Sequence, residues 1–467
     1  MVTFMLTDNT PQHSVEAIDK NLMLFYSYEE FTNSPLVFWE YIKRQTQYDT
    51  IWLVRTQEMQ KKLLDARILC CIDDTETADE YFKKAKFIIL DGRTTFMRQP
   101  SKHQIIVECI ACMHFMNDVF VNPKYIFFNP HVRNYYIQKG ANLSIATASS
   151  HFTRINSAAV FSWDVAKIYV TGIPRTDAIF SEDAKSILYS VIPELSQYKH
   201  LILYSPCAKY NGIAQISEGC YTRNIFNLID FDLVEFEQFL LSNNIGIVFK
   251  MHPFDERFNK SKNTQPPIPK NCFFLDTNSL FGKTFHHVFR AFSCMISDSS
   301  SVAYEFLLLN RPIIFLHNEI DIMISNYSKG FIIDEDSIIF PGRKAFTFFQ
   351  LIHAIGEAIE SPELFCEERE RTRKILHTYN DGKNCERLLQ VIEEYNFNDI
   401  TVQSHANNLA LNYNKLLSEY NIVTDKINAI LSSRKYRVLQ KITKILCPQF
   451  SRRRIFFSKL IRFLKRR

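Results

Sequence analysis

The side chains best suited to chemistry begin with five consecutive residues: Ser297, Asp298, Ser299, Ser300 and Ser301. A short apolar run precedes them, and a helical pattern follows until an Arg-Pro pair stops it and a second apolar run begins. Strand, polar turn, helix and strand in close succession indicate a βαβ unit of a parallel sheet. The unpaired first-turn N–H groups of such a helix favour a phosphate, although Asp and Ser in this position also commonly serve only as an N-cap.

Basic side chains follow a second apolar run. Residues 246–249 lead into Lys250 and His252, and Pro253 then breaks the chain. Because the carboxyl ends of parallel strands lie at one edge of a sheet, we expect these His, Lys, Asp and Ser side chains to face a common crevice.

Three ordered motifs make the chain similar to a known family. They read Gly172-Ile-Pro-Arg-Thr-Asp177, Lys250-Met-His-Pro253, and Ser297-Asp-Ser-Ser-Ser301 followed by Glu305. In this order and spacing they resemble the signatures of the CDP-glycerol glycerophosphotransferases, the teichoic-acid and capsule polymerase group. The resemblance covers roughly residues 20 to 385.

The resemblance also implies roles for single residues. Catalytic roles fall on His131, as the base on the acceptor hydroxyl, and on His252, at the donor's phosphates. The family histidine is normally followed by Gly, whereas Val132 follows here and removes backbone freedom. The residues expected to bind the donor are Ser205, Lys250, Ser297, Asp298, Ser299, Ser300, Ser301, Glu305 and Arg175.

Some of these residues also have purely structural interpretations. Arg175 could hold a phosphate or form an ion pair with Asp177 in the same turn. A lone histidine such as His131 is often structural, and we expect His114, on an apolar helical segment, to be so. No clustered Asp, Glu and His spacing indicates a metal site, and neither a P-loop nor a GxGxxG motif is present. We therefore expect neither a metal nor a cofactor.

Length and composition bound the architecture. With 467 residues the chain is too long for one ordinary core, so two or three domains are expected. We predict two doubly wound, Rossmann-like α/β domains facing a cleft, the glycosyltransferase B (GT-B) architecture, plus a helical C-terminal extension. The predicted domains are 1–176 on the acceptor side, 198–395 for the nucleotide donor, a coiled-coil-like helix at 396–433 and a basic tail at 434–467.

Apolar runs and turn residues place the individual elements. The first helix is predicted from Ser34 to Arg44, with Ser34 as the N-cap and Pro35 as the first helical residue. Further helices are expected at about 232–243 and within 345–395. The predicted strands are 21–26, 50–54, 86–90, 125–128, 167–171, 201–204, 246–249, 272–275, 294–297, 313–316 and 330–333.

The C-terminal region differs in character from the rest. Residues 409–430 carry a heptad seam of about three repeats, which fits a coiled-coil hairpin, a homo-oligomer helix or a helix packed on the body. The tail 434–467 contains 13 Lys or Arg and no acidic residue, which leaves 42 basic against 50 acidic residues in the rest of the chain. Aromatic and aliphatic residues alternate with these cations, which favours an anionic membrane surface over nucleic acid as the partner.

The search for targeting and membrane-spanning segments leads to an expectation about location. The polar stretch 1–19 has no apolar run of signal-peptide length, and no long apolar span is free of charges. We therefore expect neither export nor a transmembrane helix, eleven reduced cysteines, and a cytoplasmic protein peripheral on the inner face of the plasma membrane.

These observations together predict a transferase. It would move glycerol phosphate or a similar polyol phosphate from a CDP-activated donor to a hydroxyl of a surface polymer or lipid-linked acceptor. A GT-B glycosyltransferase that uses a nucleotide sugar, and a non-catalytic, membrane-docked partner of the same machinery, are the alternatives.

Overall fold

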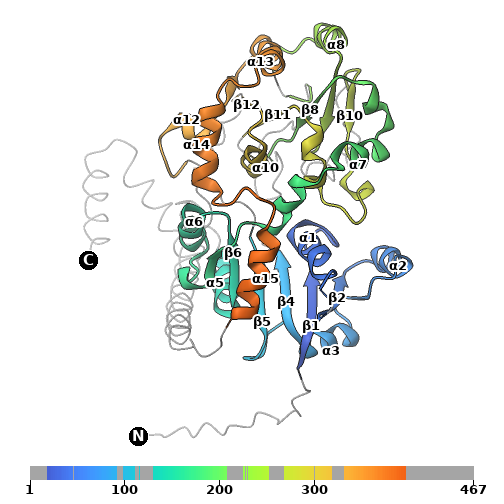
Figure 1. Ribbon diagram of the computed structural model, residues 1–467, viewed down its shortest axis with the longest axis vertical. Helices are drawn as coiled ribbons and strands as arrows, with labels where there is room; N and C mark the ends of the chain where they lie inside the picture. Colours follow the sequence, from blue (N-terminus) through green and yellow to red (C-terminus); the bar gives the residue numbers. More distant parts are fainter. Residues whose placement is uncertain are drawn as a thin grey trace, which may run out of the picture. The chain divides into compact units, whose positions relative to one another are not determined.

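The computed structural model describes most of the chain between residues 18 and 395. The described ranges are 18–45, 47–91, 98–110, 115, 130–207, 224–226, 228, 230–251, 268–298, 300–317 and 331–395, with only the backbone at 130–133. Several predictions therefore lie outside the described residues, namely strand 125–128, His252, Ser299, the heptad seam and the basic tail. The described part contains two parallel β-sheets, each flanked by helices, as predicted (Figure 1).

The first sheet has seven strands in the order β3-β2-β1-β4-β5-β6-β7, and all its neighbouring strands are parallel. Its strands are β1 (Asp19–Tyr26), β2 (Asp49–Val54), β3 (Cys70–Ile72), β4 (Ala85–Asp91), β5 (Ile105–Cys109), β6 (Ile145–Ala148) and β7 (Ile168–Val170). Alternate residues of a strand point to opposite faces, so Met23 and Phe25 pack in one core cluster while Leu22 and Leu24 pack in another. Burial on both faces explains why these strands appear as continuous apolar runs.

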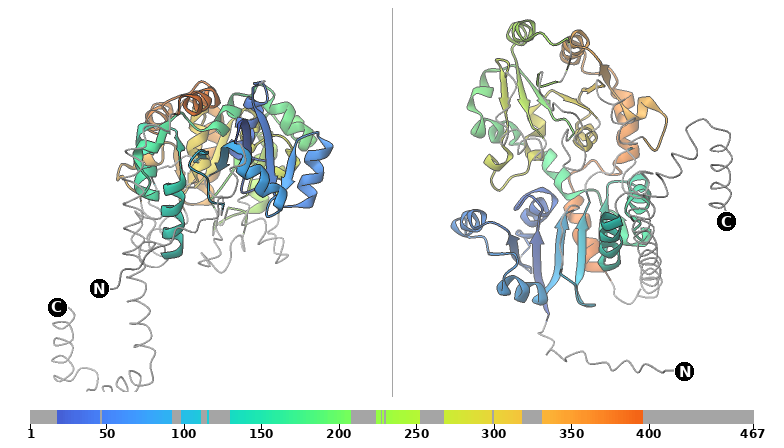
Figure 2. Two further views of the ribbon diagram at one scale, coloured as in Figure 1. Left: turned by 90° about the horizontal axis from the view of Figure 1, so that it is seen from below. Right: turned by 180° about the vertical axis from the view of Figure 1, so that it is seen from behind.

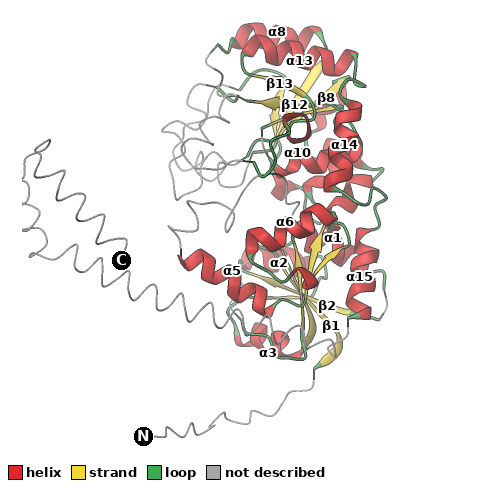
Figure 3. Cartoon of the chain, turned by 90° about the vertical axis from the view of Figure 1, so that its left-hand side faces the viewer, coloured by secondary structure: helices red, strands yellow, loops and turns green. Residues whose placement is uncertain are grey.

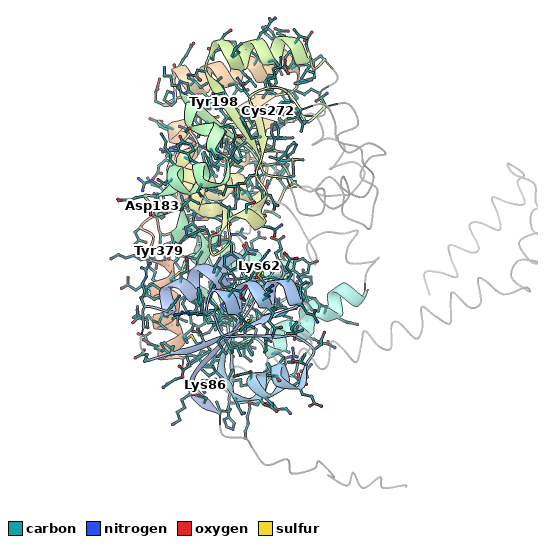
Figure 4. All side chains as sticks on the ribbon, turned by 90° about the vertical axis from the view of Figure 1, so that its right-hand side faces the viewer. Lys62, Lys86, Asp183, Tyr198, Cys272 and Tyr379 are labelled. Atoms are coloured by element: carbon teal, nitrogen blue, oxygen red, sulfur yellow. The ribbon has the colours of Figure 1, made fainter. Side chains whose placement is uncertain are left out.

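The second sheet has six strands in the order β10-β9-β8-β11-β12-β13, again all parallel. Its strands are β8 (His200–Tyr204), β9 (Ile245–Phe249), β10 (Cys272–Phe274), β11 (Cys294–Ser297), β12 (Ile313–Leu316) and β13 (Arg343–Ala345). Tyr198 and Cys272, labelled in Figure 4, belong to the β10 side of this sheet, where Tyr198 packs its ring on Phe273.

Helices cover both faces of each sheet (Figure 3). The helices of the first sheet are α1 (Asn33–Ile42), α2 (Gln57–Asp65), α3 (Glu76–Lys84), α5 (Pro130–Asn142) and α6 (His151–Phe161). Those that follow are α7 (Ala184–Val191), α8 (Leu233–Ser242), α10 (Ser301–Phe306), α12 (Asp336–Ile339), α13 (Phe348–Glu360), α14 (Cys366–Leu376) and α15 (Asn384–Glu394). Short 3-10 segments include η3 (Pro174–Phe180) and η6 (Phe285–Ala291). None of the helices in the described ranges is long and apolar enough to cross a membrane.

The last helix, α15, returns to the first sheet. Its buried residues Cys385, Leu388 and Ile392 share a core cluster with Met23 and Phe25 of β1. Figures 1 and 2 both show α15 beside this sheet. Both sheets belong to one compact unit, residues 1–397, so α15 connects the end of the second domain back to the first.

Two predicted elements differ from the structure. Helix α1 begins at Asn33 after the N-cap Thr32, so Ser34 is not the N-cap. Residues 331–333 form only an isolated bridge and bends, and the edge strand is β13 instead.

Candidate functional site

The carboxyl ends of β8 and β11 in the second sheet are linked by hydrogen bonds between Ser205 and the end of β11. In the β8–β11 register Tyr204 pairs with Ile296, and the Ser205 N–H donates to the Ile296 carbonyl at 3.0 Å. The Ser297 hydroxyl donates to the Ser205 carbonyl at 2.6 Å, and both serines are buried. The parallel pairing therefore brings together two residues that are 92 positions apart in the sequence.

Asp298 extends this link to the loop after β8. Its Oδ1 accepts a hydrogen bond from the Cys207 N–H at 2.8 Å, and only 4% of the residue is exposed. The carboxylate thus fixes the backbone that follows Ser205. The contact joins two strand ends, which is a role different from capping the helix that follows Asp298.

The start of helix α10 does not use a serine as a side-chain cap. Ser300 occupies the N-cap position and is buried, but its hydroxyl makes no capping hydrogen bond. Ser301 is the first helical residue. The simple capping interpretation is therefore wrong for Ser300, and the binding role of both serines stays a prediction.

Lys250 lies at the end of the neighbouring strand β9. Its N–H donates to the Tyr204 carbonyl at 2.9 Å, and its Nζ lies 5.6 Å from the centroid of the Phe285 ring. Since β9 pairs with β8 and β8 with β11, Lys250 shares one sheet edge with Ser205 and Ser297. The structure thus brings these predicted donor residues to one edge, as expected for parallel strands.

Arg175 and Glu305, also predicted to bind the donor, contact each other. Arg175 Nη2 and Nε lie 2.6 Å and 3.2 Å from Glu305 Oε1, and His286 Nε2 lies 2.6 Å from Glu305 Oε2. Burial opposes ionisation of the Glu305 carboxyl, but the charge of the Arg175 guanidinium and the hydrogen bonds of Arg175 and His286 outweigh it and hold its pKa well below the usual range. Glu305 is therefore an ionised carboxylate with no exposed surface.

Asp177 is not the partner of Arg175, which corrects the surface ion pair considered from the sequence. Its two carboxylate oxygens accept the N–H groups of Asn384 at 2.9 Å and Cys385 at 2.8 Å. These are the first two residues of α15. Asp177 therefore caps that helix from the turn that follows β7.

Sequence reasoning missed His286. Burial lowers the pKa of this imidazole, although the neighbouring Glu305 carboxylate raises it. A neutral ring with hydrogen on Nε2 fits its contact with Glu305, and within the described residues Nδ1 has no hydrogen-bond partner. Its aromatic surroundings, Phe285 and Phe289, resemble an ordinary core segment and gave no local signal.

His131 lies in the first turn of α5. This helix connects β5 to β6, so its N-terminus belongs to the carboxyl edge of the first sheet. The other half of α5 is anchored by Lys139, whose Nζ lies 2.9 Å from the buried Glu108 of β5. The strand expected at 125–128 lies outside the described residues, so the strand-end position of His131 stays a prediction, while the sheet edge is the expected one.

No group of three or more His, Cys, Asp or Glu side chains in the described ranges could hold a metal ion. The expectation of a metal-free site stays a prediction, since His252 and other residues lie outside those ranges.

Comparison with known proteins shows which family the chain resembles. A family model described as CDP-Glycerol:Poly(glycerophosphate) glycerophosphotransferase matches residues 9–394. The chain belongs to this family. The match spans both sheets and α15, which confirms the resemblance drawn from the three motifs.

The curated relatives to which the chain is similar include two proteins whose names contain ribitol phosphate. The chain is 30% identical over 233 residues to the teichoic acid poly(ribitol-phosphate) polymerase of Bacillus spizizenii, covering 49% of this chain and 34% of that protein. It is 27% identical to the teichoic acid ribitol-phosphate polymerase TarK of Staphylococcus aureus, covering 50% and 42%. The alignments thus span less than half the length of these two relatives.

A solved structure of the wall teichoic acid polymerase TagF is similar in fold. It superposes with a TM-score of 0.63 at 16% identity, over 83% of this chain and 90% of that structure. This likeness confirms the predicted architecture of two parallel-sheet α/β domains. The site residues stay predictions.

Proposed function

We propose that the protein transfers a polyol phosphate from a CDP-activated donor to a hydroxyl of a surface polymer or lipid-linked acceptor. The observation that carries this proposal is the family match across residues 9–394, which includes both α/β domains. The geometry of the second sheet supports it, because Ser205, Lys250 and Ser297 share the edge where nucleotides bind in such folds.

In this proposal the donor lies at the carboxyl edge of the second sheet. Lys250 supplies a positive charge for the phosphates, and the Ser299–Ser301 segment supplies hydroxyl and N–H donors. Asp298 holds the loop after β8 in place through the Cys207 N–H. Charge stabilisation and alignment are what phosphoryl transfer chiefly requires from a protein, so this edge suits the reaction.

The transfer step itself needs a base for the acceptor. We assign this role to His131, and the donor's phosphates to His252, on the strength of the family motifs. The acceptor oxygen loses its proton to the imidazole and forms a new bond to the terminal phosphorus of the donor. The bond between that phosphorus and the bridging oxygen breaks, and CMP leaves.

Ribitol phosphate is the first candidate for the transferred group. The relatives from Bacillus spizizenii and Staphylococcus aureus carry ribitol phosphate in their names. Glycerol phosphate is the second candidate, because the description of the family names it.

We further propose a cytoplasmic protein that docks on the inner face of the plasma membrane through residues 434–467 and pairs with a second copy through 409–430.

One experiment tests the reaction class. The full chain is incubated with membranes and separately with CDP-ribitol, CDP-glycerol or a panel of nucleotide sugars, and the released nucleotide is identified. Polyol-phosphate transfer leaves CMP, because one of the two donor phosphates moves to the acceptor. Release of a nucleoside diphosphate from a nucleotide sugar would instead show a glycosyltransferase, and consumption of no donor would favour a non-catalytic partner.

A further inference from the structure

The connection between β1 and α1 has an unusual backbone. Glu30, Phe31 and Asn33 have φ values of +55°, +36° and +59°, in the left-handed region that residues other than glycine seldom adopt. Such conformations persist only where the surroundings over-determine them, and they are concentrated at functional sites. The contacts around this loop must therefore hold it in one shape.

Two carboxylates hold the backbone of the loop. Asp91, at the end of β4 and only 6% exposed, accepts a hydrogen bond from the Tyr28 N–H at 3.3 Å. Glu30 Oε1 accepts the N–H groups of Arg55 and Thr56, the latter at 2.9 Å, and its Oε2 accepts the Thr56 hydroxyl at 3.0 Å. The loop is thereby fastened to the ends of β4 and β2, at the carboxyl edge of the first sheet.

Phe31 anchors the same loop in the core. The residue is 4% exposed, and the centroid of its ring lies 4.9 Å from that of Trp52 and 5.5 Å from that of Trp39. Both contacts are edge-to-face, which is a favoured arrangement of aromatic rings. The loop is thus held by polar and apolar contacts together, and the side chains that it presents have a fixed base.

Arg55 and Tyr28 form a pair at this edge. Strands β1 and β2 are parallel neighbours, with Tyr26 opposite Leu53, so the residues that follow the two strands lie close together (Figure 1). The Arg55 guanidinium lies 5.3 Å from the centroid of the Tyr28 ring, and its Nη2 donates to the Tyr28 carbonyl. Arg55 is exposed and Tyr28 is partly exposed. These contacts orient the guanidinium without removing it from solvent.

Other cations near this edge are already neutralised. Arg98 forms an ion pair with Asp73, which directly follows β3, and Lys139 Nζ lies 2.9 Å from the buried Glu108 of β5. Arg55, by contrast, forms no ion pair with any residue that the structure describes. Its positive charge is therefore available to an anion from outside the protein.

We propose that Arg55 and Tyr28 form a subsite for a phosphate group of the acceptor. The guanidinium offers N–H groups in a fork that matches phosphate oxygens, and the tyrosine ring offers an apolar surface to the carbon chain beside the phosphate. The inference rests on the proposed function and deepens it, because it assigns residues to the acceptor. The pair lies at the edge of the first sheet, whereas the proposed donor site lies at the edge of the second.

Acceptor kinetics test this role. The full chain is assayed with CDP-ribitol or CDP-glycerol and with one of three acceptors: a soluble ribitol phosphate oligomer, a soluble glycerol phosphate oligomer, or membranes that carry lipid-linked acceptor. CMP release gives kcat and the KM for the acceptor, and calorimetry gives the Kd for CDP. Arg55→Met is expected to raise the acceptor KM about tenfold or more, because charge-assisted hydrogen bonds are lost. The affinity for CDP should change less than twofold.

Further variants separate binding from a structural role. Arg55→Lys keeps a point charge but loses the fork, so its acceptor KM should lie between those of wild type and Arg55→Met. Tyr28→Phe keeps the ring and should behave like wild type, whereas Tyr28→Ala should raise the acceptor KM. Added salt should raise the KM of wild type more than that of Arg55→Met, because salt screens an exposed charge. A merely structural arginine would not give this dependence on salt.

Arg44 provides a matched control. It is exposed and lies just after α1, where the chain returns to the start of β2 at the opposite edge of the sheet. Arg44→Met therefore removes the same charge from the same domain without touching the proposed subsite. Its acceptor KM should stay within twofold of wild type. An equal rise in Arg44→Met and Arg55→Met would show that the KM follows net charge, and would overturn the inference.

The outcomes separate this inference from the proposed function. A wild type that releases CMP from neither CDP donor with any acceptor overturns the proposed function and this subsite with it. An active wild type in which Arg55→Met keeps its acceptor KM, or loses as much affinity for CDP as for the acceptor, overturns only the inference. A raised KM with the soluble oligomers assigns the subsite to a phosphodiester of the chain, and a raised KM with membranes alone assigns it to the lipid-linked phosphate. If Arg55→Met does not fold, Arg55→Gln, which keeps a donor for the Tyr28 carbonyl without the charge, takes its place in each comparison.

Discussion

Ser297 and Asp298 join the ends of two neighbouring strands through contacts to backbone groups after β8. Their chemical types were visible in the sequence, and the βαβ pattern predicted that they would lie at a sheet edge with Lys250. What the pattern could not give was the pairing of Arg175 with Glu305, because 130 residues separate them. His286 was missed for a different reason, because a histidine between aromatic residues has no local signature.

His131 is the residue whose proposed role is most directly testable. If it is the base on the acceptor hydroxyl, His131→Ala lowers turnover by roughly 10²- to 10⁴-fold while CDP binding stays nearly intact. Steady-state CMP release and calorimetry measure the two quantities. His114→Ala is the matched control and is expected to keep its turnover. Wild-type turnover of His131→Ala would contradict the assignment, and the helical position of residue 131, followed by Val132, makes this comparison informative.

The lowered pKa of the Glu305 carboxyl leads to a prediction about how the stability of the fold depends on pH. Its pKa is depressed in the folded protein, so its contribution to stability is fully present above the pKa of an unfolded glutamate and is lost as pH falls through the lower folded pKa. The difference in melting temperature between wild type and Glu305→Gln should therefore be largest near pH 7 and shrink below about pH 4.

Glu194, an exposed glutamate, serves as the control for this measurement. Glu194→Gln should leave the melting temperature close to that of wild type across the range, because an exposed side chain makes few contacts to lose. A difference for Glu305→Gln that stays constant down to pH 3 would show that the carboxylate charge is not what stabilises the fold.

At the scale of elements, the strands with four or more apolar residues and a clear polar flank were predicted well. Strands β1, β2, β4, β8, β9, β11 and β12 all overlap their predicted ranges. Strand β13 was missed because Arg343–Ala345 is short and begins with two basic residues, so its pairing with β12 comes from tertiary contact. Strands β3, β5 and β6 were not predicted either, and β3 has only three residues.

The N-terminus of helix α15 is capped by a residue that is distant in the sequence, Asp177. Removing the Asp177 carboxylate with Asp177→Ala should lower the free energy of unfolding by about 1–2 kcal/mol, because the Asn384 and Cys385 N–H groups lose their acceptor. Denaturant unfolding followed by circular dichroism measures the change. Asp183, labelled in Figure 4, is the matched control, since it occupies the N-cap of α7 without a side-chain capping bond.

Asp183→Ala should therefore cost only a few tenths of a kcal/mol, as expected for an exposed side chain without such a bond. Equal losses in Asp177→Ala and Asp183→Ala would show that the two contacts to α15 add nothing beyond the presence of an aspartate.

At the scale of the whole molecule, the two α/β domains follow from the alternation of strands and helices, but their connections do not. The sequence placed 345–395 with the second domain because of chain order, whereas α15 packs against α1 and η3 and shares a core cluster with β1. Such a return depends on contacts between residues more than 300 positions apart, such as the hydrogen bond from the Tyr48 hydroxyl to Glu393 Oε1, and no local pattern encodes it. The boundaries predicted for the domains therefore stay predictions.

The distribution of charge along the whole chain leads to a prediction about membranes. Residues 434–467 hold 13 of the 55 basic residues and none of the acidic ones, so deleting them turns a net charge of +5 into an excess of acidic residues. Each basic residue near an anionic surface contributes about 1 kcal/mol to binding. The full chain should sediment with phosphatidylserine-containing vesicles at moderate salt, while the chain ending at residue 433 should stay in the supernatant with an unchanged melting temperature.

Neutral phosphatidylcholine vesicles are the control, and they should bind the full chain far more weakly because only the apolar side chains of the tail then contribute. Sedimentation of the shortened chain with the anionic vesicles would refute the docking role of the tail, and loss of its melting transition would show that the tail belongs to the fold.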